Sequence, residues 1–449
     1  MLQHCGNRRA GSIESALFFI SDAGKVCDMA ISVEKQKALY AKLLIKIGVN
    51  LQVGQSLLIT SEVAHREFVR HVVVAAYQAG ARFVITDYID VPTDKMRFLH
   101  GRPENLDHVP GYVIARSEEI VRDKWARLAL VGEEFPNFMD DVNPALLRRA
   151  SAARAQALKA YVAAQMADAF PWCVAAVPTV PWAQKIYPNA TPKQAYAKLW
   201  KTILSMVRAD LPDPIEAWRQ HDQKLKRISA FMDQEQIRAV RFVDSVVGPD
   251  GQPNTDLTVG LTDAPLWMAA SGKTQDGQAF IANMPSEEIF TAPHRNKVNG
   301  WVRTSKPIFP LLREVRDAYF RFENGVVVDY SAGVGQEALD EFFKIAGTRQ
   351  LGEVALVDTR SPINQSGLVF YDVLFDENAA CHIAFGKAYP TCMMDGEKLS
   401  EEAQVAAGLN HSDAHDDFMI GTATMDVTGI ALDGRELPIM RQGQFVVGS

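Results

Sequence analysis

Cysteine is scarce in this sequence of 449 residues. Its five cysteines are scattered along the chain, and none forms a Cys-x-x-Cys pair. Disulfide-stapled secreted domains and thiolate metal sites both need closely spaced cysteines, so neither class fits. Reduced thiols in a cytoplasmic protein explain this usage, and we expect a cytoplasmic location.

Long hydrophobic runs and an excess of basic residues are also missing. No segment reaches the roughly 18 consecutive apolar residues that a membrane span needs. The run at 16–20 is short and is flanked by Glu14 and Asp22. Lys and Arg total 47 against 54 Asp and Glu, which gives a net charge of -7. A nucleic-acid binder usually carries a basic face, so we expect neither a nucleic acid nor a membrane as partner.

Two common catalytic signatures are absent as well. The Gly333-Val334-Gly335 turn lacks the third glycine and the Lys-Ser/Thr pair of phosphate-binding loops. The chain contains no Gly-x-Ser-x-Gly nucleophile elbow. Cys381 precedes His382, but neighbours in sequence seldom face one another, so we interpret Cys381 as a buried structural thiol.

What the chain does contain is enough apolar material for two domains. Hydrophobic residues make up 47% of it and charged residues 22%, which is typical of globular proteins. Periodic structure begins only after Met29. We therefore expect residues 1–28 to be an extension outside the folded domains.

The first half alternates between helix and strand. Residues 35–47 carry leucine and isoleucine at helical spacing, 55–60 and 82–87 are short apolar strands, and a helix between them runs to Gln78. Strand, helix and strand within about thirty residues predict a βαβ unit and hence a parallel sheet. Further on, Asn143 and Thr191-Pro192 are typical helix starts.

Near residue 240 the pattern changes to short strands separated by Gly, Asp and Asn. We therefore predict an α/β fold in two parts. An α/β domain with a parallel sheet covers 29–240, and a β-rich α+β domain covers 241–449; the residues described next make the second the expected metal-binding and catalytic domain.

The second half also holds the residues with the greatest chemical potential. His415-x-Asp417 places an imidazole and a carboxylate on one side of an extended segment, because strand side chains repeat every two residues. Glu287 and Glu288 are adjacent in an apolar segment, so one of them must face inward. Glu353 shares a strand face with core residues. Each acid alone is explained by an ion pair, and the alternative is metal binding.

Together with His382, these residues make up a ligand set for two divalent ions. Two ions about 3.5–4 Å apart supply an activated water at neutral pH and stabilise a developing oxyanion. Nitrogen and oxygen ligands without thiolate suit zinc, cobalt, manganese or magnesium.

Several long motifs in the same order resemble the aminopeptidase T and aminopeptidase S family of dinuclear metallo-aminopeptidases. The resemblance begins near Lys35 and extends to the C-terminus. The motifs are YAKLLIKIGVNL at 40–51, EEIFTAP at 287–293, LGEVALV at 351–357, LFDENAACH at 374–382 and HDDFMIG at 415–421.

This resemblance implies specific roles. The implied metal ligands are Glu287, Glu353, His382, His415 and Asp417. Tyr389 is implied to be catalytic, with its phenol donating to the oxyanion. Glu287 or Glu353 is expected to act as the base as well as a ligand, and Glu288 to lie outside the ligand set. Family members are expected to be homodimers with enclosed active sites.

The expected activity is hydrolysis of the N-terminal peptide bond of short peptides by a water that two metal ions activate. Two alternatives remain open. His415-x-Asp417 with a distant histidine matches the two-histidine, one-carboxylate triad of a mononuclear non-haem iron oxygenase. A non-catalytic peptide-binding homologue would keep the same fold.

Overall fold

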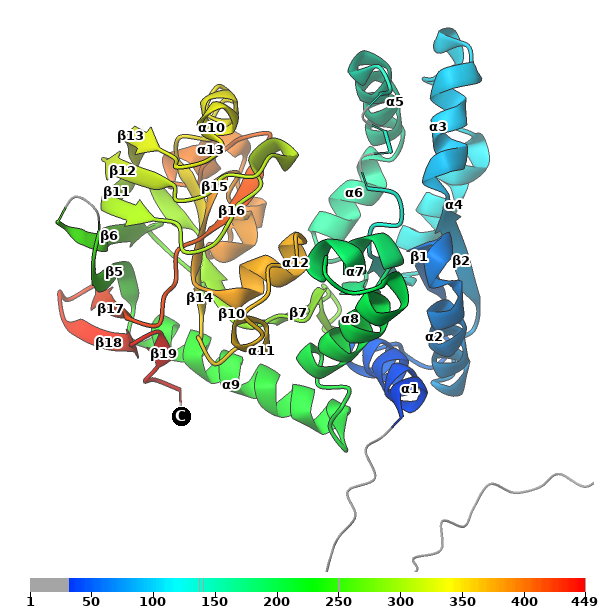
Figure 1. The fold of residues 1–449 in the computed structure, drawn as a ribbon, viewed down its shortest axis with the longest axis horizontal. Helices are drawn as coiled ribbons and strands as arrows, with labels where there is room; N and C mark the ends of the chain where they lie inside the picture. Colours follow the sequence, from blue (N-terminus) through cyan, green and yellow to red (C-terminus); the bar gives the residue numbers. More distant parts are fainter. Residues whose placement is uncertain (1–31, 137, 140, 249–250, 449) are drawn as a thin grey trace, which may run out of the picture.

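The computed structural model describes residues 32–136, 138–139, 141–248 and 251–448. The predicted extension at 1–28 lies outside these residues. The chain forms a mixed α/β half and a β-rich half, which lie side by side (Figure 1). None of the described helices is both long enough and apolar enough to cross a lipid bilayer.

A five-stranded parallel sheet organises the first half, as predicted. Its order is β2-β1-β3-β4-β9. The strands are β1 (Leu57–Glu62), β2 (Val84–Ile89), β3 (Ala126–Val131), β4 (Trp172–Ala176) and β9 (Asn283–Met284). Every neighbouring pair is parallel. β1, β3 and β4 form where short apolar runs follow a turn, and their residues are largely buried. The edge strand β2 is half-buried or exposed along its length.

Helices connect and cover these strands, and four of the eight described in this half begin at a side-chain cap. Asn143 accepts a hydrogen bond from the Ala145 amide, and Thr191 forms a capping box with Gln194. The helices of this half are α1 (Val33–Leu43), α2 (Arg66–Gln78), α3 (Val91–His100), α4 (Gly111–Arg122), α5 (Pro144–Ala157), α6 (Lys159–Met166), α7 (Val180–Ile186) and α8 (Pro192–Met206).

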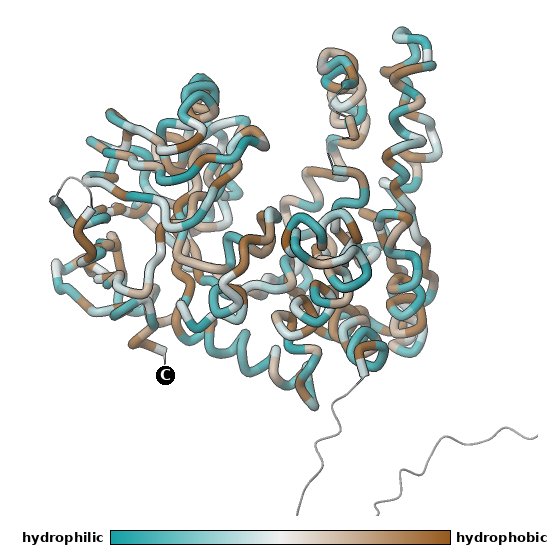
Figure 2. The backbone as a smooth tube through the Cα atoms, in the orientation of Figure 1, coloured by the Kyte–Doolittle hydropathy of each residue, from teal (hydrophilic) through white to brown (hydrophobic). Residues whose placement is uncertain are grey.

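A long helix, α9 (Pro214–Gln234), leads from the first half to the second (Figure 1). Hydrophobic and hydrophilic residues intermix along it, as expected of a helix with one buried face (Figure 2). Asp213 caps its first turn. Its buried side chains include Trp218, which packs in the core of the first half, and Ile228, which packs in the core of the second.

An eight-stranded antiparallel sheet follows, in the order β13-β12-β11-β6-β5-β17-β18-β19. Its strands are β5 (Ile237–Val247), β6 (Pro253–Leu261), β11 (Pro293–Arg303), β12 (Tyr319–Glu323), β13 (Val326–Ser331), β17 (Met425–Ala431), β18 (Glu436–Arg441) and β19 (Gln444–Phe445). This β-rich texture confirms the predicted fold class of the second half.

A second antiparallel sheet, of four strands, packs against the first. Its order is β10-β14-β15-β16, with β10 (Glu288–Thr291), β14 (Leu351–Val357), β15 (His382–Gly386) and β16 (His415–Met419). Between the sheets, the ring of Phe320 lies 5.1 Å from Phe385 and 5.5 Å from Phe418. One face of the four-stranded sheet is therefore core, and the other is free to carry polar residues.

Shorter elements complete this half and cross back to the first. They are β7 (Ser271–Lys273), β8 (Ala279–Ile281), α10 (Gln336–Phe342), α11 (Pro362–Gln365), α12 (Val373–Asp376) and α13 (Glu401–Ala406). β9 pairs with β4, while Ile363 and Phe375 pack in the core of the first half. The chain therefore does not simply divide at the predicted boundary near residue 240, although the change from helices to antiparallel strands begins at β5.

Candidate metal centre

The strand register gathers the polar residues on one face of the four-stranded sheet. Ala384 on β15 lies opposite both Glu353 on β14 and Asp417 on β16. Glu288 on β10 lies opposite Val357, which has the same parity along β14 as Glu353. Residues directly opposite in antiparallel strands share a face, and so do residues two apart. The shared face carries Glu288, Glu353, His382, His415 and Asp417.

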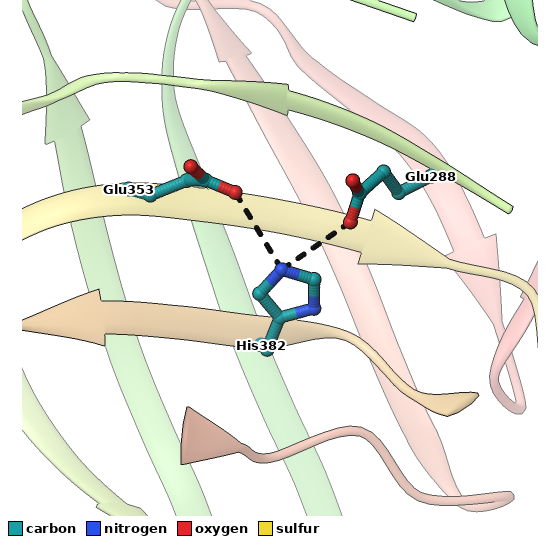
Figure 3. A group of neighbouring side chains, drawn as sticks. All are labelled: Glu288, Glu353 and His382. Atoms are coloured by element: carbon teal, nitrogen blue, oxygen red, sulfur yellow. Dashed lines mark ion pairs between the residues drawn. The ribbon is translucent and has the colours of Figure 1, made fainter. Parts of the chain in front are cut away.

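Their side chains converge. Nε2 of His382 lies 3.3 Å from Oε2 of Glu288 and 3.5 Å from Oε1 of Glu353 (Figure 3). Nε2 of His415 lies 3.7 Å from Oε2 of Glu353 and 3.7 Å from Oδ1 of Asp417. The ligand atoms of Glu288, Glu353 and His382 all lie within 4.8 Å of one another, a spacing that could hold a metal ion.

Alternation along the strands explains how this polar face exists in a folded core. Val354 and Ile383 point to the opposite face and pack in the core between the two sheets. On the ligand face, Ala355 and Ala384 stand among the acids and histidines. A methyl side chain at these two positions leaves space above the sheet that a larger residue would fill.

Backbone carbonyls orient both imidazoles. Nδ1 of His382 lies 3.1 Å from the Ala380 carbonyl oxygen, and Nδ1 of His415 lies 2.7 Å from that of Lys387. A carbonyl oxygen only accepts hydrogen bonds, so each Nδ1 carries a proton and donates it. In the neutral form, the lone pair of each Nε2 then points into the cluster, as in histidines that bind metals.

The cluster is buried and rich in negative charge. The exposed fraction is 9% or less for the side chains of Glu288, Glu353, His382 and Asp417, and 19% for His415. Oε2 of Glu288 is buried and accepts no hydrogen bond. Such an atom is costly in a protein interior unless a cation meets it. The donor set therefore fits a metal centre.

The pKa shifts reflect the same excess of buried negative charge. Burial raises the pKa of Glu288 to about 8, and the charges of Glu353 and Asp417 add to this while His382 opposes it. Burial also raises the pKa of Asp417. Burial disfavours protonated His382, but Glu353, Glu288 and Asp417 together raise its pKa well above its usual range. Protons thus offset part of the negative charge, and divalent cations would displace them.

The expectation that Glu287 joins this cluster is wrong, because Glu288 occupies the place. The side chain of Glu287 points away and contacts Arg208, with Nη1 2.7 Å from its Oε1. Adjacent residues of an extended chain face opposite ways, so only one acid of the pair can join the ligand face. The other four expected residues do lie in the cluster: Glu353, His382, His415 and Asp417.

Tyr389 also lies at the centre, as expected. Its ring centroid is 4.9 Å from that of His415. Burial raises the pKa of its phenol, and the nearby charges of Glu353 and Asp417 raise it further. The phenol therefore keeps its proton at any physiological pH and remains a hydrogen-bond donor.

Sequence reasoning overlooked one acidic neighbour, Glu377. It lies in a short 3-10 helix that packs on β16. Burial raises its pKa well above the usual range, and the charges of Asp417 and Glu288 add to the effect. The available signal was an acid five residues before His382, but strand periodicity does not place such a residue.

Comparison with known proteins decides the family. The model of the thermophilic metalloprotease (M29) family matches residues 33–445. The chain belongs to the M29 metalloproteases. It is 38% identical to Aminopeptidase 2 of Geobacillus stearothermophilus over 92% of this chain and 98% of that protein. It is 37% identical to Aminopeptidase T of Thermus thermophilus over 91% of this chain and 97% of that one.

A solved structure agrees. The wild-type AmpT structure from Thermus thermophilus superposes with a TM-score of 0.83 at 35% sequence identity, covering 93% of this chain and 100% of that one. As an M29 metalloprotease, the chain is a hydrolase that uses a divalent metal. Nothing in these comparisons supports the iron oxygenase or the non-catalytic homologue.

Proposed function

We propose that this M29 metalloprotease is an aminopeptidase that removes N-terminal residues from short peptides at a centre of two divalent cations. The observation that carries the proposal is the convergence of five side chains from four strands around a buried carboxylate oxygen without a hydrogen bond. The relatives that match nearly the whole chain are aminopeptidases by name.

We assign the ligands as Glu288, Glu353, His382, His415 and Asp417, so that Glu288 replaces Glu287 in the predicted set. Glu353 faces His382 with Oε1 at 3.5 Å and His415 with Oε2 at 3.7 Å, so it would help to hold a cation at either histidine. Asp417 likewise faces both histidines, at 3.9 Å and 3.7 Å. Because Glu353 and Asp417 each lie between the two histidines, the arrangement supports two ions rather than one. Nitrogen and oxygen donors suit zinc, cobalt, manganese or magnesium.

When bound, two such cations supply an activated water and stabilise the charge that develops on the substrate carbonyl. Side chains of the centre stabilise the oxyanion and transfer the proton. Tyr389 keeps its phenolic proton and can donate a hydrogen bond to the developing oxyanion. Of the two acids predicted as base, only Glu353 lies at the centre. Glu353 would take the proton of the attacking water through an oxygen that is not holding a cation, and would pass it to the leaving amine.

A homodimer and a cytoplasmic location belong to this proposal. The described cysteines Cys173, Cys381 and Cys392 are free and buried, which supports a reducing compartment. The net charge of -7 gives no support for a nucleic-acid partner.

Elemental analysis combined with a peptidase assay tests the proposal. Purified protein should hold two divalent ions per chain, lose activity on aminoacyl-p-nitroanilides after chelation, and regain it with Zn, Co or Mn. One redox-active iron per chain without hydrolysis would favour the oxygenase. A fully loaded chain that cleaves no substrate would favour the non-catalytic homologue.

A further inference from the structure

Glu287, which lies beside the metal centre without joining it, is held by contacts of its side chain and its backbone. Nη2 of Arg208 donates a hydrogen bond to Oε2 at 3.0 Å, and Nη1 forms an ion pair with Oε1 at 2.7 Å. The exposed fraction is 6% for the Glu287 side chain and 15% for Arg208. A buried guanidinium–carboxylate pair with a charge-assisted hydrogen bond holds both side chains in place.

The backbone around Glu287 is held as firmly. The Glu287 amide donates to Oδ1 of Asn378 at 2.6 Å, and Asn378 is itself fully buried. Nε2 of His221 lies 2.8 Å from the carbonyl oxygen of Ser286. The residue that precedes Glu288 is therefore held through its amide, through the carbonyl before it and through its side chain.

The tautomer of His221 follows from its neighbours. Nη2 of Arg208 lies 3.2 Å from Nδ1 of His221. A guanidinium has no acceptor, so Nδ1 must accept and the proton of the neutral ring resides on Nε2. That proton is the one donated to Ser286. Arg208 thus supports the segment twice, once through Glu287 and once through His221.

Arg208 is itself fixed by the first half of the molecule. It lies in the turn between α8 and α9, with a φ of 60°. Its guanidinium stacks over the ring of Trp218 at 5.1 Å, and the Trp218 indole donates to the Val207 carbonyl at 2.7 Å. The pair with Glu287 therefore ties this turn to the first residues of β10, in the four-stranded sheet.

We propose that Arg208, Glu287 and His221 form an anchor that positions the metal ligand Glu288, so that the affinity and geometry of the metal centre depend on residues that touch no metal. These are positioning residues, and the inference rests on the proposed function. Glu288 follows the anchored residue directly and opens β10. Its Oε2 accepts no hydrogen bond, so its position depends on its backbone and on the cation. Outer contacts of this kind typically change metal affinity by about 10–100-fold.

Three variants of the full-length protein test this anchor: E287Q, R208Q and the double variant R208Q/E287Q. R116Q is the control, because Arg116 also pairs with a carboxylate, Asp87, but on α4 and β2, in the other half of the molecule (Figure 1). The affinity for Zn²⁺ is measured by competition with a chromophoric chelator. The Co²⁺ absorption spectrum reports ligand geometry, and kcat and KM are measured at saturating metal.

We expect E287Q and R208Q to weaken Zn²⁺ binding by roughly 10–100-fold and to change the Co²⁺ spectrum. At saturating metal, kcat should fall while KM stays close to the wild-type value. Both single variants break the Arg208–Glu287 contact, so the double variant should be no worse than R208Q, which also loses the contact of Arg208 with His221. R116Q should stay within about twofold of wild type.

R208Q leaves a buried carboxylate without its partner and is the variant most prone to misfolding. The double variant carries no unpaired charge, so it decides the question if R208Q does not fold. The anchor is refuted if the double variant and E287Q bind Zn²⁺ as tightly as R116Q with an unchanged Co²⁺ spectrum. If instead the wild-type chain binds no metal, the proposed function itself fails.

Discussion

Replacing Glu288 with glutamine should stabilise the metal-free protein and destabilise the metal-loaded one. Glu288 has a pKa of about 8 in the folded chain against an ordinary value of 4.5. At pH 7 the unfolded chain has released this proton, and the folded chain must take it up again. With about 1.4 kcal/mol per pKa unit, the cost at pH 7 is about 3 kcal/mol.

The sign of this effect depends on pH. Below a pH of about 4.5 the carboxyl is protonated in both states, so it costs nothing. The cost grows as the pH rises from 4.5 towards 8 and is constant above that. Glutamine resembles the neutral carboxyl in shape and removes the cost. Metal-free E288Q should therefore unfold at a higher temperature than wild type at pH 8, and at a similar temperature at pH 4.5.

Bound metal should reverse the order of stability, so that wild type becomes more stable than E288Q. A cation that binds only the folded wild-type chain stabilises it by about 4 kcal/mol when free metal is a thousandfold above Kd. E288Q lacks one anionic ligand and should gain far less. Thermal unfolding after chelation and after Zn²⁺ addition, at both pH values, gives the four comparisons. E337Q, at an exposed position on α10, is the control and should follow wild type throughout.

Two results would refute this reasoning. If metal-free E288Q is less stable than wild type at pH 8, Glu288 is satisfied by its protein neighbours and needs no cation. If Zn²⁺ stabilises E288Q as much as wild type, Glu288 is not a ligand.

Three further predictions concern the centre. H382A should lower the metal content measured by elemental analysis and reduce peptidase activity by at least about a hundredfold; unchanged metal content would exclude His382 as a ligand. Y389F should reduce kcat by roughly 10²–10³-fold with metal content and KM unchanged, since it removes one oxyanion donor; an unchanged kcat would exclude that role. G386A should weaken metal binding in the chelator competition assay. Gly386 has a φ of 104°, and an added Cβ would lie 2.1 Å from the carbonyl oxygen of Ala414, so the backbone next to the ligand His415 would have to move. Wild-type affinity would show that β16 tolerates this movement.

Much of the first half could be predicted from the sequence because its signals are local. The apolar runs that become β1 and β2, and the caps at Asn143 and Thr191, depend on residues within a few positions of one another. β9 could not be predicted in this way. It joins the parallel sheet beside β4 across more than a hundred residues, and its two residues carry no periodic pattern.

The candidate site was predictable up to the facing of one pair of acids. Strand periodicity indicates that either Glu287 or Glu288 faces inward, but it does not decide which of the two does. The choice is fixed by the pairing of Glu288 with Val357 and by the contact of Glu287 with Arg208, which is distant in sequence. The position of Glu377 beside the centre could not be predicted for a related reason, because Glu377 lies in a single helical turn and not in a strand.

The most direct test of the account is an anomalous diffraction map, recorded at the zinc edge, from crystals of the Zn²⁺-loaded protein. The account predicts two peaks per chain, enclosed by Glu288, Glu353, His382, His415 and Asp417, with the Glu287 side chain on Arg208. A single peak, a peak coordinated by Glu287, or no peak on this face of the four-stranded sheet would contradict it.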